Sequence, residues 1–249
     1  MKTCVRKKRK TGYRIFKFCV KTFYHSTRFL GKENLLNKPC VIVANHAQIH
    51  GPLAVELQFP REKYIWMTGE MARFRDIPAY AMNDFWGYKK GIKRAFYKCL
   101  SYICAPFFAF VHKNANIIDV YKDARVIKTF KNTVSALKEG ADVVIFPESR
   151  ELNNEFINKF QERFVDVARI YYKATGEDLT FVPMYNAPKL KVSVFGKPIT
   201  YDHNQLAEKQ REEVCAYLSD EITRIAQNLP RHKIVPYDNV GRKNYNYSK

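Results

Sequence analysis

Short apolar runs and longer stripes of helical period alternate along the chain. The short runs are rich in β-branched and aromatic residues, which is typical of buried strands, and they occupy residues 40–44, 64–67, 143–146, 181–184 and 192–195. We therefore expect these runs to pair in a sheet.

Apolar residues with a period of three to four predict helices between several of these runs. The stripe at residues 123–140 has Asp123 as its expected N-cap and Gly140 just past its end. A second stripe comprises Phe156, Phe160, Phe164, Val167, Ala168 and Tyr171. Residues 53–59 predict one more helix, for which Pro52 suits the first position.

Strands that alternate with helices of this length are typical of an α/β protein. We expect a mixed, partly parallel sheet covered by helices, with functional loops at the strand ends. The 249 residues contain no internal repeat and no Gly/Ser-rich linker. The expected organisation is one α/β domain at residues 31–230, preceded by a basic segment at residues 1–30 and followed by a basic tail at residues 231–249.

The N-terminal segment predicts a basic amphipathic helix between residues 13 and 30. One face would carry Phe16, Cys19, Val20 and Phe23, and the opposite face Arg14, Lys17, Lys21 and Arg28. The apolar face could pack on the domain or lie on a membrane surface. Five basic residues precede the helix at residues 6–10, and each contributes on the order of 1 kcal/mol near an anionic bilayer. This cluster favours a membrane-surface anchor.

Residues 95–111 form the longest apolar stretch. It is shorter than the roughly 20 residues of a membrane-spanning helix, and Lys98 and Pro106 interrupt it. Two interpretations remain open: a buried core helix, or a helical segment that dips into the headgroup region of a bilayer.

Net charge narrows the classes of partner. Lys and Arg number 43 against 24 Asp and Glu, a formal charge of +19, which indicates an extended anionic partner such as a lipid surface or nucleic acid. Residues 241–249 mix cations with tyrosines that could stack on bases, but no nucleic-acid-binding motif accompanies them. Nucleic acid is therefore the less favoured partner.

Cysteine usage indicates a reducing compartment. The six cysteines form no CxxC pair and no Cys/His cluster with metal-binding spacing, so we expect free thiols and no metal. Lys17 and Lys21 also interrupt the apolar region that a secretory signal would need.

A polar cluster follows the first predicted strand, with the sequence Asn45-His46-Ala47-Gln48-Ile49-His50-Gly51-Pro52. A histidine on a loop just past a strand end is well placed for proton transfer, because its ordinary pKa lies near neutrality. A lone histidine there could equally be a hydrogen-bonded structural residue. His46 therefore needs support from a second element.

That support comes from residues 143–150, where another strand ends in a turn that carries Glu148, Ser149 and Arg150. A carboxylate, a hydroxyl and a guanidinium together suit a phosphate-bearing substrate, although a surface salt bridge is the alternative for such a pair. A weaker third element joins Phe181-Val182-Pro183-Met184 to the turn Phe195-Gly196-Lys197-Pro198-Ile199.

The order and spacing of these blocks resemble the lysophosphatidate acyltransferase family of glycerophospholipid acyltransferases. Its members carry NHxxxxDP, a Gly/Ile/Pro/Arg block, FPEGTR, a V-P-hydrophobic strand and a GKP turn, and the match runs over residues 41–199. The resemblance implies that a histidine deprotonates the hydroxyl of a glycerol-phosphate or lysophospholipid acceptor. That hydroxyl then attacks the thioester of acyl-CoA or acyl carrier protein, and no cofactor is needed.

Carried onto this chain, the resemblance makes His46 the catalytic base and assigns Asn45, Glu148, Ser149 and Arg150 to substrate binding. The second block matches loosely at residues 118–125, where Lys122 stands in place of the family arginine and Arg125 could serve instead. The expected location is the cytoplasmic side of a membrane, as a peripheral or monotopic protein.

The chain departs from the family at Gly51, which stands where the family has the aspartate that orients the imidazole. His50, Glu56 and Glu148 are candidate substitutes, and Ser149 replaces a family glycine. Loss of an orienting carboxylate costs about 10⁴ in rate in the serine protease template. Two readings follow: an acyltransferase with a rewired dyad, or a catalytically weak relative that still binds lipid.

Overall fold

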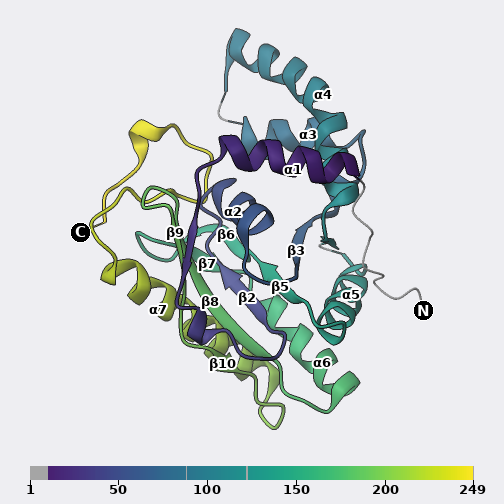
Figure 1. Ribbon diagram of the computed structural model, residues 1–249, viewed down its shortest axis with the longest axis vertical. Coiled ribbons are helices and arrows are strands. Elements are labelled where there is room, and N and C mark those ends of the chain that lie inside the picture. The colour runs from purple at the N-terminus through teal and green to yellow at the C-terminus, as the bar shows by residue number, and fades with distance from the viewer. Residues whose placement is uncertain (1–10, 88, 122, 249) are drawn as a thin grey trace.

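The computed structural model describes residues 11–87, 89–121 and 123–248, and its centre is an eight-stranded sheet of order β1-β9-β8-β2-β5-β3-β4, with β10 paired to β8 (Figure 1). The strands of the parallel part are β2 (Val41–Ala44), β5 (Asp142–Ile145), β3 (Lys63–Thr68), β4 (Ile117–Val120) and β8 (Thr180–Ala187). On the other side of β8 lie β9 (Val192–Phe195), β10 (Ile199–Thr200) and β1 (Arg28–Leu30). β8 pairs antiparallel with both β9 and β10, which makes the sheet mixed.

Helices cover both faces of this sheet, so the expected α/β class is confirmed. One face packs on α5 (Val126–Lys138), α6 (Val167–Thr175) and α7 (Ala207–Asn228), and the other on α2 (His50–Gln58). Val41 and Val43 of β2 face the first layer, while Ile42 and Ala44 face the second. β2 is thus buried on both faces, which explains its continuous apolar run.

The predicted strands all form, within one to three residues at their ends. The helix predicted at residues 123–140 also forms, but its N-cap is Arg125; Asp123 instead accepts the backbone N–H of Arg125 at 2.9 Å. The helix after Pro52 begins at His50, two residues earlier than predicted.

The helix expected from the stripe that starts at Phe156 is wrong in its first half. Residues there form a small hairpin of β6 (Glu148–Leu152) and β7 (Asn158–Phe160), and the chain then enters a 3₁₀ turn, Glu162–Asp166, before α6. Phe156 and Phe160 are apolar because they pack on the core beside this hairpin, and their spacing matches a helical period without a helix.

A helical layer lies at the top of Figure 1, beyond α2. It contains α1 (Thr11–Phe23), α3 (Ile77–Tyr80) and the 24-residue α4 (Gly91–Asn114). α1 and α4 are joined by aromatic contacts: the rings of Phe16 and Phe107 lie edge to face at 4.9 Å, and Tyr13 is 6.1 Å from Phe110.

α4 corrects one of the two interpretations of residues 95–111. Within the described chain it is long and apolar enough, at 24 residues, to cross a membrane, so the expectation that this stretch is too short to span one was wrong in its bounds. It is also mostly exposed, which contradicts a buried core helix. Its exposed apolar side chains are Ile92, Phe96, Tyr102, Ile103, Phe107 and Phe110.

α1 is amphipathic but differs in detail from the predicted helix. Tyr13, 1% exposed, is its most buried residue, and Lys17, expected on the solvent face, points to the domain and pairs with Glu56 at 3.1 Å. Phe18 and Phe23 are exposed. The basic cluster at residues 6–10 lies outside the described residues.

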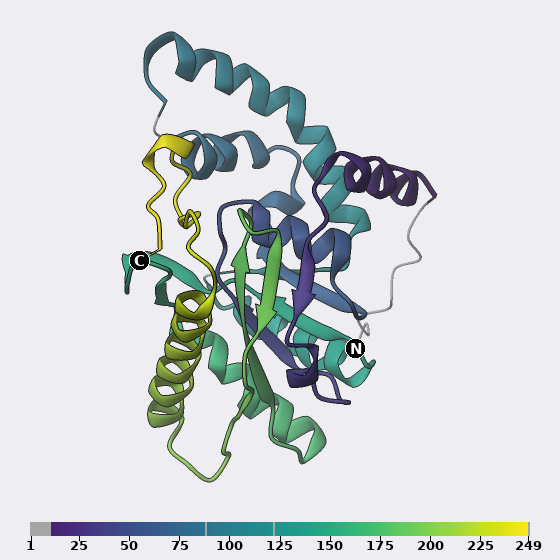
Figure 2. The same ribbon diagram turned by 60° about the vertical axis from the view of Figure 1, so that its left-hand side comes forward.

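The C-terminal tail is part of the folded body. It leaves the end of α7 and rises toward α3, as the yellow segment in Figure 2 shows. Lys233 and Tyr247 form an antiparallel bridge within it, and Ile234, Val235, Tyr245 and Ser248 are buried. The division at residues 31 and 231 stays a prediction.

Candidate functional site

The predicted motif residues meet at the carboxyl ends of two adjacent parallel strands, β2 and β5. His46 follows β2, and Glu148 begins β6 after β5. The backbone N–H of His46 donates to Glu148 Oε2 at 2.5 Å, and the backbone N–H of Asn158 donates to Glu148 Oε1 at 2.9 Å. Glu148 therefore joins the two motif loops through its carboxylate.

Glu148 is 3% exposed, and this burial has the largest effect on the pKa of its carboxyl. Desolvation raises the pKa of its carboxyl to about 7, although the two backbone N–H donors oppose this rise by stabilising the anion. The carboxyl is thus near half-protonated at neutral pH. Because both oxygens are engaged by backbone donors, Glu148 acts as a brace in this geometry, and its contact with an acceptor stays a prediction.

The His46 ring is held on several sides. Its Nδ1 contacts the backbone carbonyl oxygen of Gln48. The rings of Phe146 and Tyr237 meet it edge to face, with centroids at 5.3 Å and 5.6 Å. This contact with Gln48 requires a tight loop, in which Ala47 and Gln48 adopt left-handed conformations with φ of 46° and 55°.

The Gln48 carbonyl decides the chemistry of the ring. A carbonyl only accepts hydrogen bonds, so Nδ1 of the neutral ring must carry the proton and Nε2 keeps the lone pair. Burial lowers the pKa of His46, which favours this neutral form, while the hydrogen bond to the Gln48 carbonyl and the nearby Asp84 oppose the shift. The arrangement can supply a neutral base at Nε2 under physiological conditions.

Asn45, the first motif residue, directly follows β2 and is 2% exposed. Its Oδ1 accepts the backbone N–H of Asn186 at 2.6 Å, and its Nδ2 donates to the Asn186 carbonyl at 3.1 Å. The Asn186 amide in turn donates to the Asn45 carbonyl at 2.8 Å. This pair fixes the end of β2 against β8, and the substrate contact predicted for Asn45 remains untested.

Gly51 lies directly beneath this arrangement. A Cβ at this position would stand 2.6 Å from the His46 carbonyl oxygen and 3.0 Å from Asn186 Nδ2. These distances are shorter than van der Waals contact, so a larger residue would displace the His46 backbone. The local structure therefore excludes an aspartate here as well as lacking one.

His50 and Glu56, two proposed replacements for that aspartate, lie in other environments. His50 Nδ1 is 3.3 Å from the Tyr24 hydroxyl. Glu56 pairs with Lys63 at 2.8 Å and with Lys17 at 3.1 Å, and it ties α1 and β3 to α2. The group that reaches His46 Nδ1 is the Gln48 carbonyl instead.

Arg150 and Ser149 lie on the β6 side of the site. The Arg150 side chain is 73% exposed and pairs at 3.1 Å with Asp84, from the π-helical turn Ala81–Phe85. Ser149 Oγ accepts the backbone N–H of Glu151 at 3.2 Å. Arg150 is thus an exposed cation paired with Asp84, and the substrate contacts predicted for Arg150 and Ser149 stay predictions.

The second-block residues lie farther along the same sheet edge. Arg125 follows β4, three strands from β2, a separation of roughly 14 Å at ordinary strand spacing. Its guanidinium is bound by Asp123 at 2.7 Å and stacks over the Tyr121 ring. Lys122 lies outside the described residues.

The tail brings residues to the site that the sequence did not suggest. Tyr237 packs on the His46 ring, and Tyr245 donates its hydroxyl to Gln48 Oε1 at 2.9 Å. Gln48 Nε2 donates to the carbonyl of Asp238 at 2.9 Å. The signal available beforehand was a tyrosine-rich tail, which also fits base stacking, and nothing in its spacing pointed to His46.

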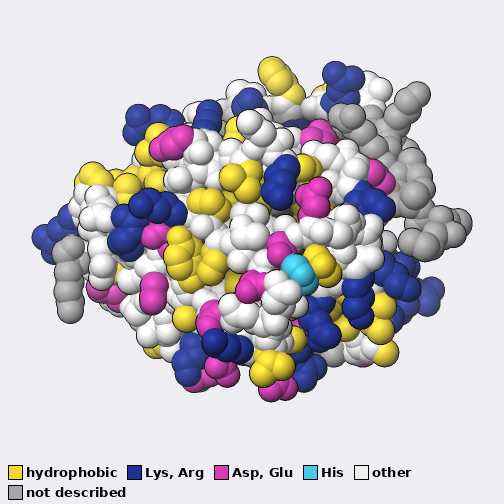
Figure 3. Space-filling model, turned by 90° about the horizontal axis from the view of Figure 1, so that it is seen from below, with side chains coloured by type: hydrophobic (Ala, Val, Ile, Leu, Met, Phe, Trp, Pro, Cys, Tyr) yellow, Lys and Arg dark blue, Asp and Glu magenta, His cyan; other side chains and the backbone are white. Residues whose placement is uncertain are grey.

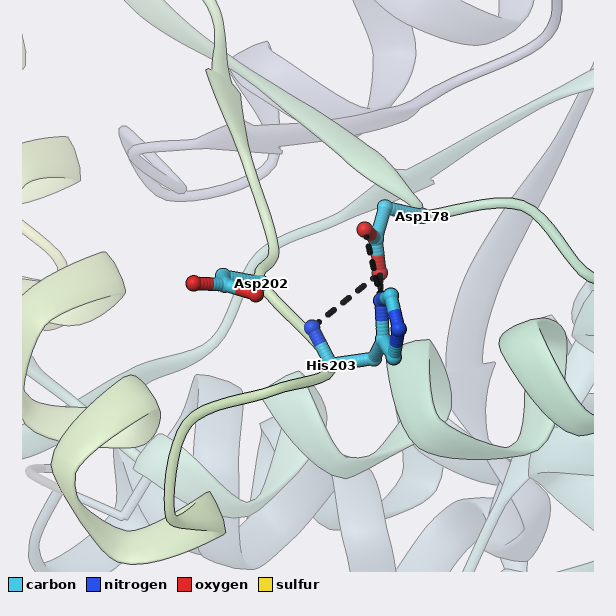
Figure 4. A group of neighbouring side chains, drawn as sticks. All are labelled: Asp178, Asp202 and His203. Atoms are coloured by element: carbon cyan, nitrogen blue, oxygen red, sulfur yellow. Dashed lines mark hydrogen bonds and ion pairs between the residues drawn. The ribbon is translucent and has the colours of Figure 1, made fainter.

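Another polar hollow lies at the opposite end of the sheet. A cavity of about 620 Å³ between α6 and the start of α7 is lined by Arg169, Tyr172, Lys173, Tyr201, His203 and Arg211, among others. Beside it, the His203 ring points toward Asp178 at 3.0 Å, and Asp202 lies to the other side (Figure 4). These three could hold a metal by spacing, but His203 and Asp178 already satisfy each other.

Comparison with known proteins finds a similarity in structure only. No protein-family model matches the chain, and no curated protein matches it. Among solved structures, the chain is similar to the crystal structure of the 1-acyl-sn-glycerophosphate (LPA) acyltransferase PlsC from Thermotoga maritima. The identity is 14% and the TM-score 0.47, over 86% of this chain and 76% of that one. The similarity is one of fold, and the reaction must be inferred from the chain's own residues.

Proposed function

We propose that this protein transfers a fatty acyl group from an acyl thioester to the hydroxyl of a glycerol-phosphate or lysophospholipid acceptor at a membrane surface. The observation that carries the proposal is the His46 ring, whose Nδ1 is engaged by a carbonyl and whose loop is joined to the second motif by Glu148. These are two of the blocks through which the sequence resembles lysophosphatidate acyltransferases.

The chemistry follows from the neutral ring. Nε2 of His46 removes the proton from the acceptor hydroxyl as its oxygen attacks the thioester carbonyl. The C–S bond then breaks, and the departing thiolate takes the proton from the imidazolium. The products are an ester and a free thiol, and His46 returns to its neutral state without a cofactor or metal.

Arg150 suits the anionic part of the acceptor. It lies two residues after Glu148 in β6 and its side chain is largely exposed, and a planar guanidinium binds phosphate oxygens in a bidentate manner. Asp84, its present partner, would have to share or release it. The acceptor phosphate would then lie above the β6 side while the hydroxyl faces His46.

Membrane contact is supported by the helical layer. α1 and α4 expose phenylalanines and isoleucines at one end of the molecule, and Phe18 and Ile92 are 72% and 91% exposed. The opposite end carries Lys and Arg interspersed with Asp and Glu (Figure 3). An apolar face of this kind suits insertion at the headgroup boundary, on the cytoplasmic side expected from the free cysteines.

The test is acyl transfer by the purified full chain on anionic vesicles. Acyl-CoA and acyl carrier protein serve as donors, with glycerol 3-phosphate, lysophosphatidate and an uncharged monoacylglycerol as acceptors. Acylated product should be measured by mass spectrometry beside thiol release, because exposed Cys19 and Cys99 also react with thiol reagents. We expect transfer to a phosphate-bearing acceptor.

The variant His46→Ala should reduce transfer by at least a hundredfold, since general-base catalysis contributes about 10²–10⁴. His203→Ala is the matched control, because His203 lies at the opposite end of the sheet and should leave the rate unchanged. Equal rates for the two variants would remove His46 as the base. Vesicle binding without transfer by the wild-type chain would instead favour the lipid-binding alternative.

A further inference from the structure

We propose that Tyr245 is a positioning residue for His46: acting through Gln48, it fixes the imidazole in the Nδ1–H tautomer with a backbone carbonyl in place of a carboxylate. The inference rests on the proposed function for its kinetic consequence. Its structural half, the tautomer of His46, stands independently of any activity.

The first step is the loop conformation. Ala47 and Gln48 both have positive φ, at 46° and 55°, a region that is strained for residues with a Cβ. Such strain persists only where surrounding contacts determine the conformation. This conformation directs the Gln48 carbonyl oxygen toward His46 Nδ1.

The second step is what holds the loop. The Gln48 side chain makes three hydrogen bonds to the tail. Its Nε2 donates to the carbonyls of Asp238 at 2.9 Å and Val240 at 3.2 Å, and its Oε1 accepts from the Tyr245 hydroxyl at 2.9 Å. Both ends of the amide are therefore satisfied, and its orientation is fixed.

Apolar packing reinforces the same contact. Ala47, 1% exposed, packs with Val235 and Tyr245 of the tail, and Val240 lies against this cluster. The strained dipeptide is thus covered on its apolar side and hydrogen-bonded on its polar side by one segment. The segment in question is the tail, which contributes nothing to the sequence motif.

The third step is that the other candidate groups do not orient the His46 ring. Gly51 leaves no space for a carboxylate beneath the ring, His50 contacts Tyr24, and Glu56 is engaged by lysines. Glu148 reaches the backbone N–H of His46 and not its ring. Among the described residues, the ring's hydrogen-bonded orientation comes from the Gln48 carbonyl.

The tautomer is measurable by NMR on the full chain labelled with ¹⁵N-histidine. Two-bond ¹⁵N–¹H correlations should show His46 with a protonated Nδ1 and an unprotonated Nε2 at neutral pH. Tyr245→Phe should move both nitrogen shifts toward a mixture of tautomers. A wild-type ring protonated at Nε2 would overturn the proposal.

Tyr245→Phe is suited to this test because it keeps the ring that packs on Ala47 and removes the hydroxyl alone. The matched control is Tyr247→Phe, which removes the same atom from an exposed tyrosine of the same tail. Unfolding temperatures within a few degrees of wild type establish that both variants are folded. Identical His46 shifts in the two variants would count against Tyr245.

The kinetic test separates positioning from general stability. Loss of the hydrogen bond from Tyr245 to Gln48, which acts on His46 only indirectly, should lower kcat about fivefold to tenfold and leave KM within about twofold. In Gln48→Gly the backbone carbonyl remains and positive φ is free of strain, but the amide that Tyr245 holds is absent. Tyr245→Phe should therefore have no further effect in that background.

The outcomes distinguish the two proposals. Full additivity of the two substitutions would show that Tyr245 acts by another route and would overturn the positioning role. A wild-type chain with the Nδ1–H tautomer but without acyl transfer would overturn the proposed function and leave the positioning of the ring established.

Discussion

At the scale of single residues, burial acts on His46 and Glu148 so that each favours its neutral form. Desolvation lowers the pKa of the imidazole and raises that of the carboxyl to about 7. The two groups are joined through the His46 backbone N–H and not through the ring. Their titrations should therefore be separable by measuring rate and stability independently.

The pH dependence of kcat reports the imidazole. His46 must be deprotonated to accept a proton, and a lowered pKa means that it is already deprotonated at neutral pH. We expect kcat to stay level from pH 8 to pH 7 and to fall only below pH 6.5, the ordinary value for histidine. A midpoint of the acid limb above 6.5 would contradict the direction of the shift.

Unfolding free energy reports the carboxyl. The pKa of Glu148 is raised from 4.5 to about 7, so between these values the folded state binds more protons than the unfolded state. Stability should thus fall by about 3 kcal/mol from pH 4.5 to pH 7.5 on account of this group alone. Glu148→Gln does not titrate, and its urea unfolding should lack this component. Parallel pH profiles for wild type and variant would exclude the assignment.

The sequence predicted that His46 and Glu148 each lie on a loop after a buried strand, but it left open which of His50, Glu56 and Glu148 would approach His46. The sequence did not predict that the Gln48 carbonyl contacts His46 Nδ1, or that His50 and Glu56 interact with other residues. Those depend on backbone dihedrals and on which way α2 faces, and neither is encoded in a short local pattern. Position 51 shows the same limit, because only the structure shows that the space around Gly51 is too small for a Cβ.

At the scale of elements, strands buried on both faces were predictable, and short polar ones were not. β2 and β8 have continuous apolar runs, whereas β6 carries Glu148 and Arg150 and reads as a turn. The stripe beginning at Phe156 failed because core contacts from a hairpin matched the period of a helix. The helix predicted to reach residue 30 ends at Phe23, and residues 28–30 pair with β9 as strand β1 instead. Lys17 turned inward because Glu56 offered a partly buried partner.

The exposed face of α1 gives a sharp test of membrane contact. Phe18→Glu removes a side chain that is 72% exposed and so should change the folded state little. It should weaken binding to anionic vesicles about tenfold more than Thr22→Glu, because both add one charge but only the first removes an apolar group. Equal binding by the two variants would exclude the insertion of this face. Vesicle co-sedimentation measures both.

At the scale of the whole molecule, the tail is the part that most changes the picture drawn from sequence. Its cations and tyrosines suggested an arm for nucleic acid or lipid. Instead, Tyr185 binds His232 at 3.0 Å, Ser248 caps the His232 backbone N–H at 2.9 Å, and the segment packs against the motif loop. Composition alone does not distinguish a free basic arm from a tail that packs against the domain.

Removal of residues 231–249 should therefore destabilise the protein as well as inactivate it. The loss of buried Ile234 and Val235 alone is worth roughly 3–6 kcal/mol, which urea unfolding would detect. Leu152→Ala is the control, because Leu152 is 74% exposed and lies outside the tail. Its unfolding midpoint should match wild type. A tail-less chain of undiminished stability would show that the tail is not part of the fold.

The position of the tail in the chain has a consequence for the order of assembly. Every strand of the sheet, and both motif loops, leave the ribosome before Tyr237 and Tyr245 do. A nascent domain can thus pair its strands while Ala47 and Gln48 still relax to unstrained backbone angles. The orientation of the His46 ring by the Gln48 carbonyl is therefore expected to form later, when Tyr237 and Tyr245 pack over this loop.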